Sequence, residues 1–196
     1  PFILFSQTQL GADINGEATS DLSGQSVSFN SDGTIVAIGA TDNYGNGSSS
    51  GHVRVYQYSS GSWSQLGADI NGEASSDYSG YSVSLSSDGT KVAIGAYGND
   101  GNGSFSGHVR VYGYSGSSWS QLGSDINGEA TEDLSGSSVS LSNDGTKVAI
   151  GAYGNDGNGT SSGHVRVYGY SGSSWSQLGS DINGEAQYDL SGHSVS

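Results

Sequence analysis

Residues 82–96 read SVSLSSDGTKVAIGA, two runs of alternating apolar residues on either side of the Asp88-Gly89 pair. Asp-Gly between alternating runs is the strongest short-range sequence signal for a β-hairpin. A second hairpin is predicted downstream, where residues 108–114 and 119–123 flank a Ser-Gly-Ser-Ser turn. The stretch therefore predicts four short antiparallel strands that follow one another in sequence order.

The same pattern recurs along the chain with a fixed period. Trp63, Trp119 and Trp175 are 56 residues apart (119 − 63 and 175 − 119), and Gln65 and Gln121 keep the same step. A period of this size is typical of solenoids, propellers and arrays, and four antiparallel strands suit one propeller blade. The predicted divisions are a partial blade at 1–22, full blades at 23–78, 79–134 and 135–190, and the start of a further blade at 191–196.

The predicted fold class is all-β, a β-propeller-type array of four-stranded antiparallel blades. Val83 and Leu85 share one face of their strand, whereas serines occupy the other, and a face of small residues lets the next blade approach closely. Three full blades are fewer than the roughly four to eight of a closed propeller. We therefore expect a segment of a larger propeller or repeat chain, with an open or fibrous array as the alternative. The predicted strands are 7–10; 26–30, 35–40, 52–58 and 63–66; 82–86, 91–96, 108–114 and 119–122; 138–142, 147–152, 164–170 and 175–178; and one that begins at 194.

The composition is strongly acidic. The chain has 5 Lys and Arg against 19 Asp and Glu, a formal net charge of −14, and no cysteine. Because phosphate binding needs Lys and Arg, this balance argues against nucleic acid and anionic membranes as partners. The charge suits either a solvated surface or one that gathers cations. No apolar run approaches the roughly 18 residues of a membrane-spanning helix, so membrane insertion is not expected.

Three segments of the second unit resemble a known repeat. Residues 79–85, 92–96 and 107–112 read SGYSVSL, VAIGA and GHVRVY, and they resemble the FG-GAP repeat. That repeat builds the seven-bladed propeller of integrin α chains and occurs in many bacterial surface proteins. The resemblance implies adhesion, ligand binding or surface architecture, at the cell surface or outside the cell. The family's calcium loop between the first two strands is replaced here by the tight turn 87–90, so we expect no calcium at that position.

The connection between units carries oxygen-bearing side chains at its positions 1, 3, 5 and 9. This spacing is similar to the start of an EF-hand loop, which surrounds a hard cation with oxygen ligands. The Glu at position 12 is missing, so the sequence predicts weak Ca²⁺ binding, with a Kd on the order of 10⁻⁴–10⁻³ M. The alternative is a turn in which Asp side chains accept hydrogen bonds from backbone N–H groups. The residues are Asp13, Asn15, Glu17 and Asp21; Asp69, Asn71, Glu73 and Asp77; Asp125, Asn127, Glu129 and Asp133; and Asp181, Asn183, Glu185 and Asp189.

The connection between the second and third strands of each unit holds an N-glycosylation sequon, at Asn46, Asn102 and Asn158. Topology places this loop and the connection between units at the same end of the array, and long loops carry function more often than tight turns. In a secreted eukaryotic protein these asparagines are expected to carry glycans. In a bacterium the same pattern would be a by-product of a turn rich in Gly, Asn and Ser.

A histidine and an arginine recur at the start of the third strand of each unit. The histidines of neighbouring blades are too far apart to share one metal ion, so we expect each to pack or hydrogen-bond at the strand end. The arginines lie on the same strand face, and we expect each to pair with an acidic residue of a neighbouring unit. The residues are His52, His108 and His164, with Arg54, Arg110 and Arg166.

Catalysis finds little support in the sequence. There is no cysteine, no serine lies in a nucleophile-elbow context, and the acidic residues occur equivalently in every unit. We therefore predict a non-enzymatic extracellular or cell-surface repeat protein with a structural or adhesive role, whose partners are further copies of itself, other surface proteins or glycans. One alternative is a calcium-assisted carbohydrate- or protein-binding propeller of lectin or integrin type. A second is a propeller segment attached to an enzyme domain outside this chain.

Overall fold

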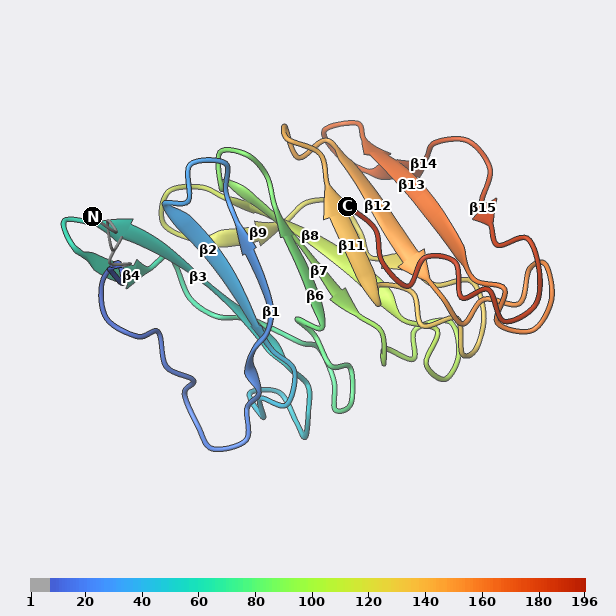
Figure 1. Ribbon diagram of the computed structural model, residues 1–196, viewed down its shortest axis with the longest axis horizontal. Coiled ribbons are helices and arrows are strands. Elements are labelled where there is room, and N and C mark those ends of the chain that lie inside the picture. The colour runs from blue at the N-terminus through green and yellow to red at the C-terminus, as the bar shows by residue number, and fades with distance from the viewer. Residues whose placement is uncertain (1–7) are drawn as a thin grey trace, which may run out of the picture.

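The alternating segments of the sequence form β-strands throughout the computed structural model, which describes residues 8–196 (Figure 1). No helix occurs among these residues, so none there is long and apolar enough to cross a membrane. We refer to residues 23–78, 79–134 and 135–190 as units one, two and three. Unit one holds β1 (Ser23–Phe29), β2 (Ile35–Ala40), β3 (His52–Ser59), β4 (Ser62–Gln65) and β5 (Ile70–Asn71); unit two holds β6 (Ser82–Leu85), β7 (Lys91–Ala96), β8 (His108–Tyr114), β9 (Trp119–Gln121) and β10 (Ile126–Asn127); unit three holds β11 (Ser138–Leu141), β12 (Lys147–Ala152), β13 (His164–Tyr170), β14 (Trp175–Gln177) and β15 (Ile182–Asn183).

Each unit is one antiparallel sheet whose first four strands pair in sequence order, as the sequence predicts. The first hairpin of unit two pairs Val83 with Ile94 and Leu85 with Val92. The turn between them is closed by Asp88, whose Oδ1 accepts hydrogen bonds from the backbone N–H and the hydroxyl of Thr90. Asp88 is therefore engaged in the turn itself. The sequence missed the two-residue strands β5, β10 and β15, which pair with the start of the third strand.

The three sheets lie side by side in sequence order (Figure 1). The face with small residues of one unit packs against the larger face of the next. Ser82 Oγ donates a hydrogen bond of 2.7 Å to the carbonyl of Gly136, and the N–H of Leu141 donates one of 2.9 Å to Ser84 Oγ. A Cβ atom on Gly95 would overlap the carbonyl oxygen of Gly136, so the backbones approach as closely as glycine allows.

The apolar core consequently lies between the sheets. One core cluster joins Val53, Val55 and Ile70 of unit one to Leu85 and Ile94 of unit two. A second cluster joins units two and three in the same way. In each unit an aromatic pair links the end of the third strand to the start of the fourth: Tyr58 with Trp63, Tyr114 with Trp119 and Tyr170 with Trp175.

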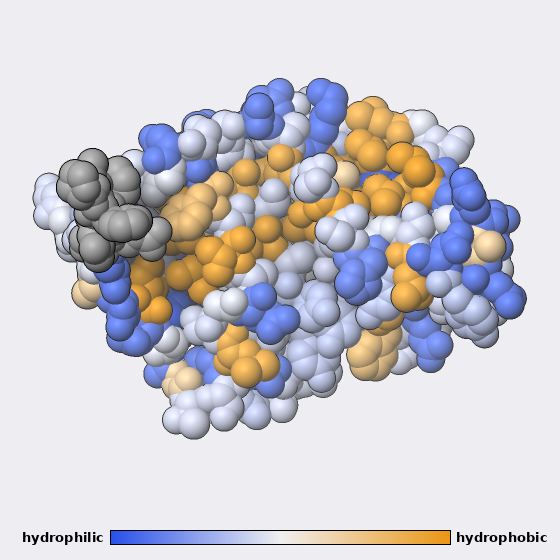
Figure 2. Space-filling view, in the orientation of Figure 1, coloured by the Kyte–Doolittle hydropathy of each residue, from blue (hydrophilic) through white to orange (hydrophobic). Residues whose placement is uncertain are grey.

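The outer face of unit one has no neighbouring sheet among the described residues. Val27 is 52% exposed and Phe29 55% exposed, and Figure 2 shows apolar surface over β1 and β2 at the left of the view. Both predicted terminal strands differ from the structure: Gln7 lies outside the described residues, and neither 8–10 nor 194–196 forms a strand. The repeat pattern of the sequence continues at both ends, but a strand of three or four residues needs a paired neighbouring strand to satisfy its backbone N–H and C=O groups.

Candidate functional site

The long connections gather at one end of the units and are hydrogen-bonded to one another. The loop between β7 and β8 contacts the connection between units two and three, because the Nδ2 group of Asn102 donates to the carbonyl of Gly128 over 2.8 Å. Backbone hydrogen bonds from Glu132 to Ser104 and from Leu134 to Phe105 join the same two segments. At this end of the array, each long loop is therefore held to the following connection by hydrogen bonds.

The asparagines of the three sequons are exposed, yet their side-chain amides take part in these contacts. The Nδ2 groups of Asn46, Asn102 and Asn158 donate to the carbonyls of Gly72, Gly128 and Gly184, which lie in the following connection. An amide that is substituted by a glycan keeps one N–H. The hydrogen bond and a glycan are therefore chemically compatible at the same nitrogen.

The aspartate at position 9 of each predicted calcium loop is engaged by the backbone. Asp77 is buried, and its Oδ2 accepts hydrogen bonds from the N–H groups of Glu73 and Ala74. Its Oδ1 accepts one from the side-chain amide of Asn99 in the neighbouring loop. Asp133 is buried in the same way, and Asp21 and Asp189 cap the equivalent backbone N–H. These contacts are those of the turn that the sequence offered as its alternative.

The other members of each predicted loop set point to different neighbours. Asp69 Oδ1 accepts a hydrogen bond of 2.7 Å from Gln65, and Asn71 lies in β5. Glu73 Oε1 instead lies 3.3 Å from Nη1 of Arg110 in unit two. The side chains of positions 1, 3, 5 and 9 in one loop are thus directed apart, and the calcium site at those positions stays a prediction.

The structure brings together carboxylates from successive connections around the histidine of the third strand. Nδ1 of His108 lies 3.9 Å from Glu73 Oε2 and 3.9 Å from Asp125 Oδ2. The histidine is 1% exposed, whereas the two carboxylates are at the surface. We call such a group a Glu–His–Asp cluster. The described residues hold three of them, each able to contain a metal ion: Glu17, His52 and Asp69; Glu73, His108 and Asp125; and Glu129, His164 and Asp181.

Burial determines the charge of these histidines. Removal from water is the main cause that lowers the pKa of His108 to about 4, followed by the nearby guanidinium of Arg110, while the carboxylate of Asp125 opposes both. Burial likewise lowers the pKa of His52 and of His164. The imidazoles are therefore neutral at pH 7, and their contacts with carboxylates are not ion pairs.

The predicted pairing of the arginines with neighbouring acids is confirmed. Arg110 contacts Glu73 of the preceding connection, and its Nη2 donates a hydrogen bond of 2.8 Å to the carbonyl of Asn71. Its guanidinium lies over the ring of Tyr112. Arg54 and Arg166 make the equivalent contacts. Each arginine thus fixes a connection onto the following sheet.

Sequence reasoning identified every member of these clusters but not their grouping. The loop spacing suggested that ligands would come from one connection, whereas Glu73, His108 and Asp125 come from three separate segments. The sequence feature that could have indicated the grouping is the 56-residue period. Glu, His and Asp recur at fixed offsets in each unit, so one contact between units generates the same contact at every junction.

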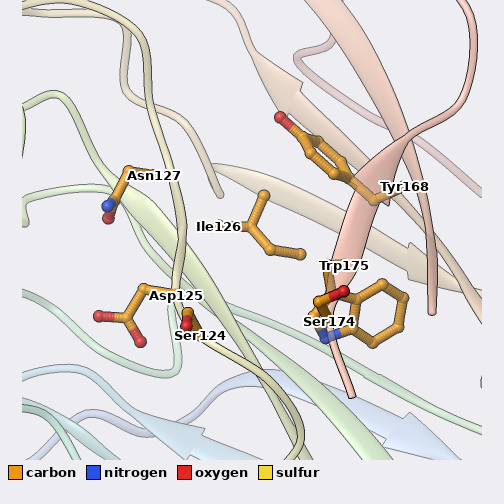
Figure 3. A pocket seen from close by; sticks show the side chains of 7 residues that line it. All are labelled: Ser124, Asp125, Ile126, Asn127, Tyr168, Ser174 and Trp175. Atoms are coloured by element: carbon orange, nitrogen blue, oxygen red, sulfur yellow. The ribbon is translucent and has the colours of Figure 1, made fainter. Parts of the chain in front are cut away.

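A pocket of about 300 Å³ lies beside Asp125, between the end of unit two and the rim of unit three (Figure 3). In Figure 3, Ile126 points toward Tyr168 and Trp175, while the carboxylate of Asp125 points away from the tryptophan. Smaller equivalents adjoin Trp119 and Trp63. The pocket therefore recurs at each junction, with an aromatic wall on one side and an acidic connection on the other.

Parts of the sequence match the model of a known repeat family. The model of the FG-GAP repeat matches residues 71–112 and 127–168. Two segments of the chain, in tandem, therefore match the FG-GAP repeat. These two matches lie on the repeat units described above, and they confirm the resemblance carried by residues 79–85, 92–96 and 107–112. No curated protein sequence matches the chain.

Solved structures show the same architecture. A Bacteroides fragilis protein, provisionally assigned as a 6-phosphogluconolactonase, aligns with a TM-score of 0.56 at 11% identity, over 82% of this chain and 38% of its own. Sqt1 of Saccharomyces cerevisiae aligns with a TM-score of 0.53 at 16% identity, over 86% of this chain and 38% of its own. At these identities the likeness shows the fold alone. This chain spans under half the length of each of these structures.

Proposed function

We propose that these FG-GAP repeats form a non-enzymatic protein outside the cell or at its surface, with a structural or adhesive role that includes filamentous assembly. The observation that carries this proposal is the equivalence of the three units. Each junction presents the same Glu–His–Asp cluster, the same arginine contact and the same aromatic pocket. An enzyme needs one distinct constellation, whereas equal sites suit repeated weak contacts that combine through avidity.

The two outer faces of the array support a partner that is a further copy of the same repeat. Unit one exposes Val27 and Phe29 on the larger face of its sheet, and unit three exposes Ile182 on the opposite, smaller face. Inside the chain these two kinds of face pack against each other at both junctions. A head-to-tail contact of this kind is heterologous and extends into a ring or a filament.

Immunogold electron microscopy of intact source cells, with an antibody against this chain, tests the location and the role together. Label on the cell surface, or on filaments outside it, is the expected result. Label confined to the cell interior would remove the extracellular and adhesive role. Mass spectrometry of the same material should find glycans at Asn46, Asn102 and Asn158 if the source glycosylates sequons.

A second candidate is calcium-assisted binding of a carbohydrate or protein at the acidic junctions. The recurring pocket favours it, because Trp175 and Tyr168 offer flat aromatic surface next to Asp125. A glycan array probed with the chain in millimolar Ca²⁺ would identify a ligand. Binding that disappears in the Asp69→Ala, Asp125→Ala double variant would support this candidate, and unchanged binding would remove the acidic connections from the ligand site.

A further inference from the structure

We propose that each Glu–His–Asp cluster binds one divalent transition-metal ion, with Zn²⁺ the best fit, and thereby fastens one unit to the next. The cluster in unit two is typical. Its ligands would be Oε2 of Glu73, Nδ1 of His108 and Oδ2 of Asp125, and the ligand atoms in each cluster all lie within 4.8 Å of one another. The clusters at His52 and His164 have the same composition.

In each of the two carboxylates, one oxygen contacts a neighbouring side chain and the other oxygen faces the imidazole. Oε1 of Glu73 lies 3.3 Å from the guanidinium of Arg110, and Oδ1 of Asp125 accepts a hydrogen bond of 2.6 Å from Gln121. The remaining oxygens, Oε2 and Oδ2, are the atoms nearest to Nδ1 of His108. Contacts of this kind orient the ligating side chains of metal sites.

The histidine supplies an independent sign of a ligand. Nδ1 of His108 is buried and has no hydrogen-bond partner among residues 8–196, and Nδ1 of His164 is in the same situation. A buried polar atom without a partner is costly, and such atoms in native structures call for an explanation such as an ion. The neutral imidazole carries a lone pair on this nitrogen when its proton is on Nε2. A metal ion between the three side chains would satisfy it.

The chemistry of the donors selects the kind of ion. Ca²⁺ and Mg²⁺ take oxygen ligands, whereas a site that includes imidazole suits Zn²⁺ and its neighbours in the first transition row. Tetrahedral Zn²⁺ with bonds near 2.1 Å separates its ligands by about 3.3 to 3.4 Å. The observed separations of 3.9 Å from His108 to each carboxylate would close by roughly half an ångström on binding. The partly exposed carboxylates allow the ion to enter and leave room for a water ligand.

Such an ion would join three segments that are distant in the sequence. Glu73 belongs to the connection before unit two, His108 to the start of β8 and Asp125 to the connection after β9. Metal binding is expected to raise the stability of the folded chain, because the unfolded chain does not preserve this arrangement.

Isothermal titration calorimetry of the purified, metal-free chain with Zn²⁺ alone is the first test. We expect a stoichiometry of three ions per chain, together with a higher melting temperature. Asp125→Asn should reduce the stoichiometry from three to two, and Glu73→Gln should do the same. These changes keep side-chain size, and the amide oxygen introduced by Asp125→Asn can still accept the hydrogen bond from Gln121. The melting temperature of each metal-free variant checks that it folds. A Zn²⁺ stoichiometry below one, or one that stays at three in both variants, would overturn the proposal.

The chain supplies a matched control for the charge that each variant removes. Asp13 occupies the same repeat position as Asp125 and accepts the same hydrogen bond from a glutamine, Gln9, but it belongs to none of the three clusters. Asp13→Asn should leave three ions bound. An equal loss in this variant would show that Zn²⁺ merely collects on an acidic surface, and the proposal would fail.

Nuclear magnetic resonance of the imidazole nitrogens separates ligation from such diffuse attraction. On addition of Zn²⁺, the Nδ1 signals of His52, His108 and His164 should shift, while those of the exposed His193 should not. Shifts confined to His193, or the same shifts with Ca²⁺ in place of Zn²⁺, would contradict the assignment. Because the readout is binding to the chain itself, failure here would leave the structural or adhesive role untouched.

Discussion

The same face of the sheet has opposite surroundings in units one and two. Phe29 in β1 is 55% exposed, whereas Leu85, at the equivalent position of β6, is 7% exposed. Both are large apolar residues on an alternating strand, so the difference comes from the neighbouring sheet and not from the residue type. Each core in this chain is therefore shared between two units, and a unit on its own would leave the apolar face that it now buries against its neighbour in water.

The largest effect is expected where the two backbones meet at this shared core. Gly95→Ala would place a Cβ atom on the carbonyl oxygen of Gly136, which is a backbone atom and cannot rotate away as a side chain could. Forced separation of the sheets should lower the free energy of unfolding by about 3 kcal/mol or more. Gly116→Ala is the control, because nothing lies within 4 Å of a Cβ there and only the positive φ of 91° opposes the change. Urea unfolding followed by tryptophan fluorescence measures the stability of both variants. Equal losses of stability would show that the close approach of the Gly95 and Gly136 backbones is unimportant.

Truncation of the two equivalent side chains tests the comparison directly. Leu85→Ala should lower the free energy of unfolding by about 2–3 kcal/mol, because it opens a cavity between units one and two. Phe29→Ala should cost well under about 1 kcal/mol, since its ring is largely in water already. Denaturant melts of the two variants provide the numbers. Similar losses would mean that the outer face of unit one is covered in solution, as a head-to-tail contact between chains would require.

The comparison also explains how far the sequence could predict the structure. The bounds 35–40, 91–96 and 147–152 were predicted to the residue, because alternation and a tight Asp-Gly turn act within one hairpin. The two-residue strands such as Ile126–Asn127 were missed. They arise from pairing with β8 and carry no periodicity of their own.

The candidate site shows the same limit. Every residue of the Glu–His–Asp clusters stood out in the sequence, but Glu73 and Asp125 were assigned to separate loops. Glu73 meets His108, 35 residues away (108 − 73), through the stacking of consecutive sheets, whereas Asp125 meets it, 17 residues away (125 − 108), through the pairing of β10 with β8. The local sequence pattern cannot predict contacts between residues this far apart. Because the units repeat strictly, however, one Glu–His–Asp cluster implies the others.

A smaller effect is expected from the hydrogen bond at the rim of the same junction. Nε1 of Trp119 donates to the carbonyl of Leu66 over 2.8 Å in a partly buried contact. Trp119→Phe should lower the free energy of unfolding by about 1 kcal/mol, since that carbonyl would lose its partner. Trp63→Phe breaks the equivalent bond to Leu10, which is exposed, so water can replace it at lower cost. If the two variants lost the same stability, the shared core would not extend to the rim.

The smallest effect concerns a tyrosine that unit one lacks. Tyr97 packs against Tyr78 and Tyr81, and unit one has Thr41 at the equivalent position. Burial, followed by the neighbouring tyrosines, raises the pKa of Tyr97 to about 12 from an ordinary value of 10. A raised pKa in the folded state means that the unfolded chain releases this proton first. Its contribution is therefore fully present below about pH 10 and is lost as the pH rises toward about 12.

Tyr97→Phe tests this titration, because the variant has no proton to lose at this site. In urea unfolding, the difference in stability between the variant and the native chain should stay fixed from about pH 7 to 9. Above about pH 10 the stability of the variant should rise relative to that of the native chain, since only the native chain then loses the contribution of the protonated phenol. A difference that stays constant to about pH 11.5 would show that Tyr97 titrates alike in both states and that the aromatic group is open to water.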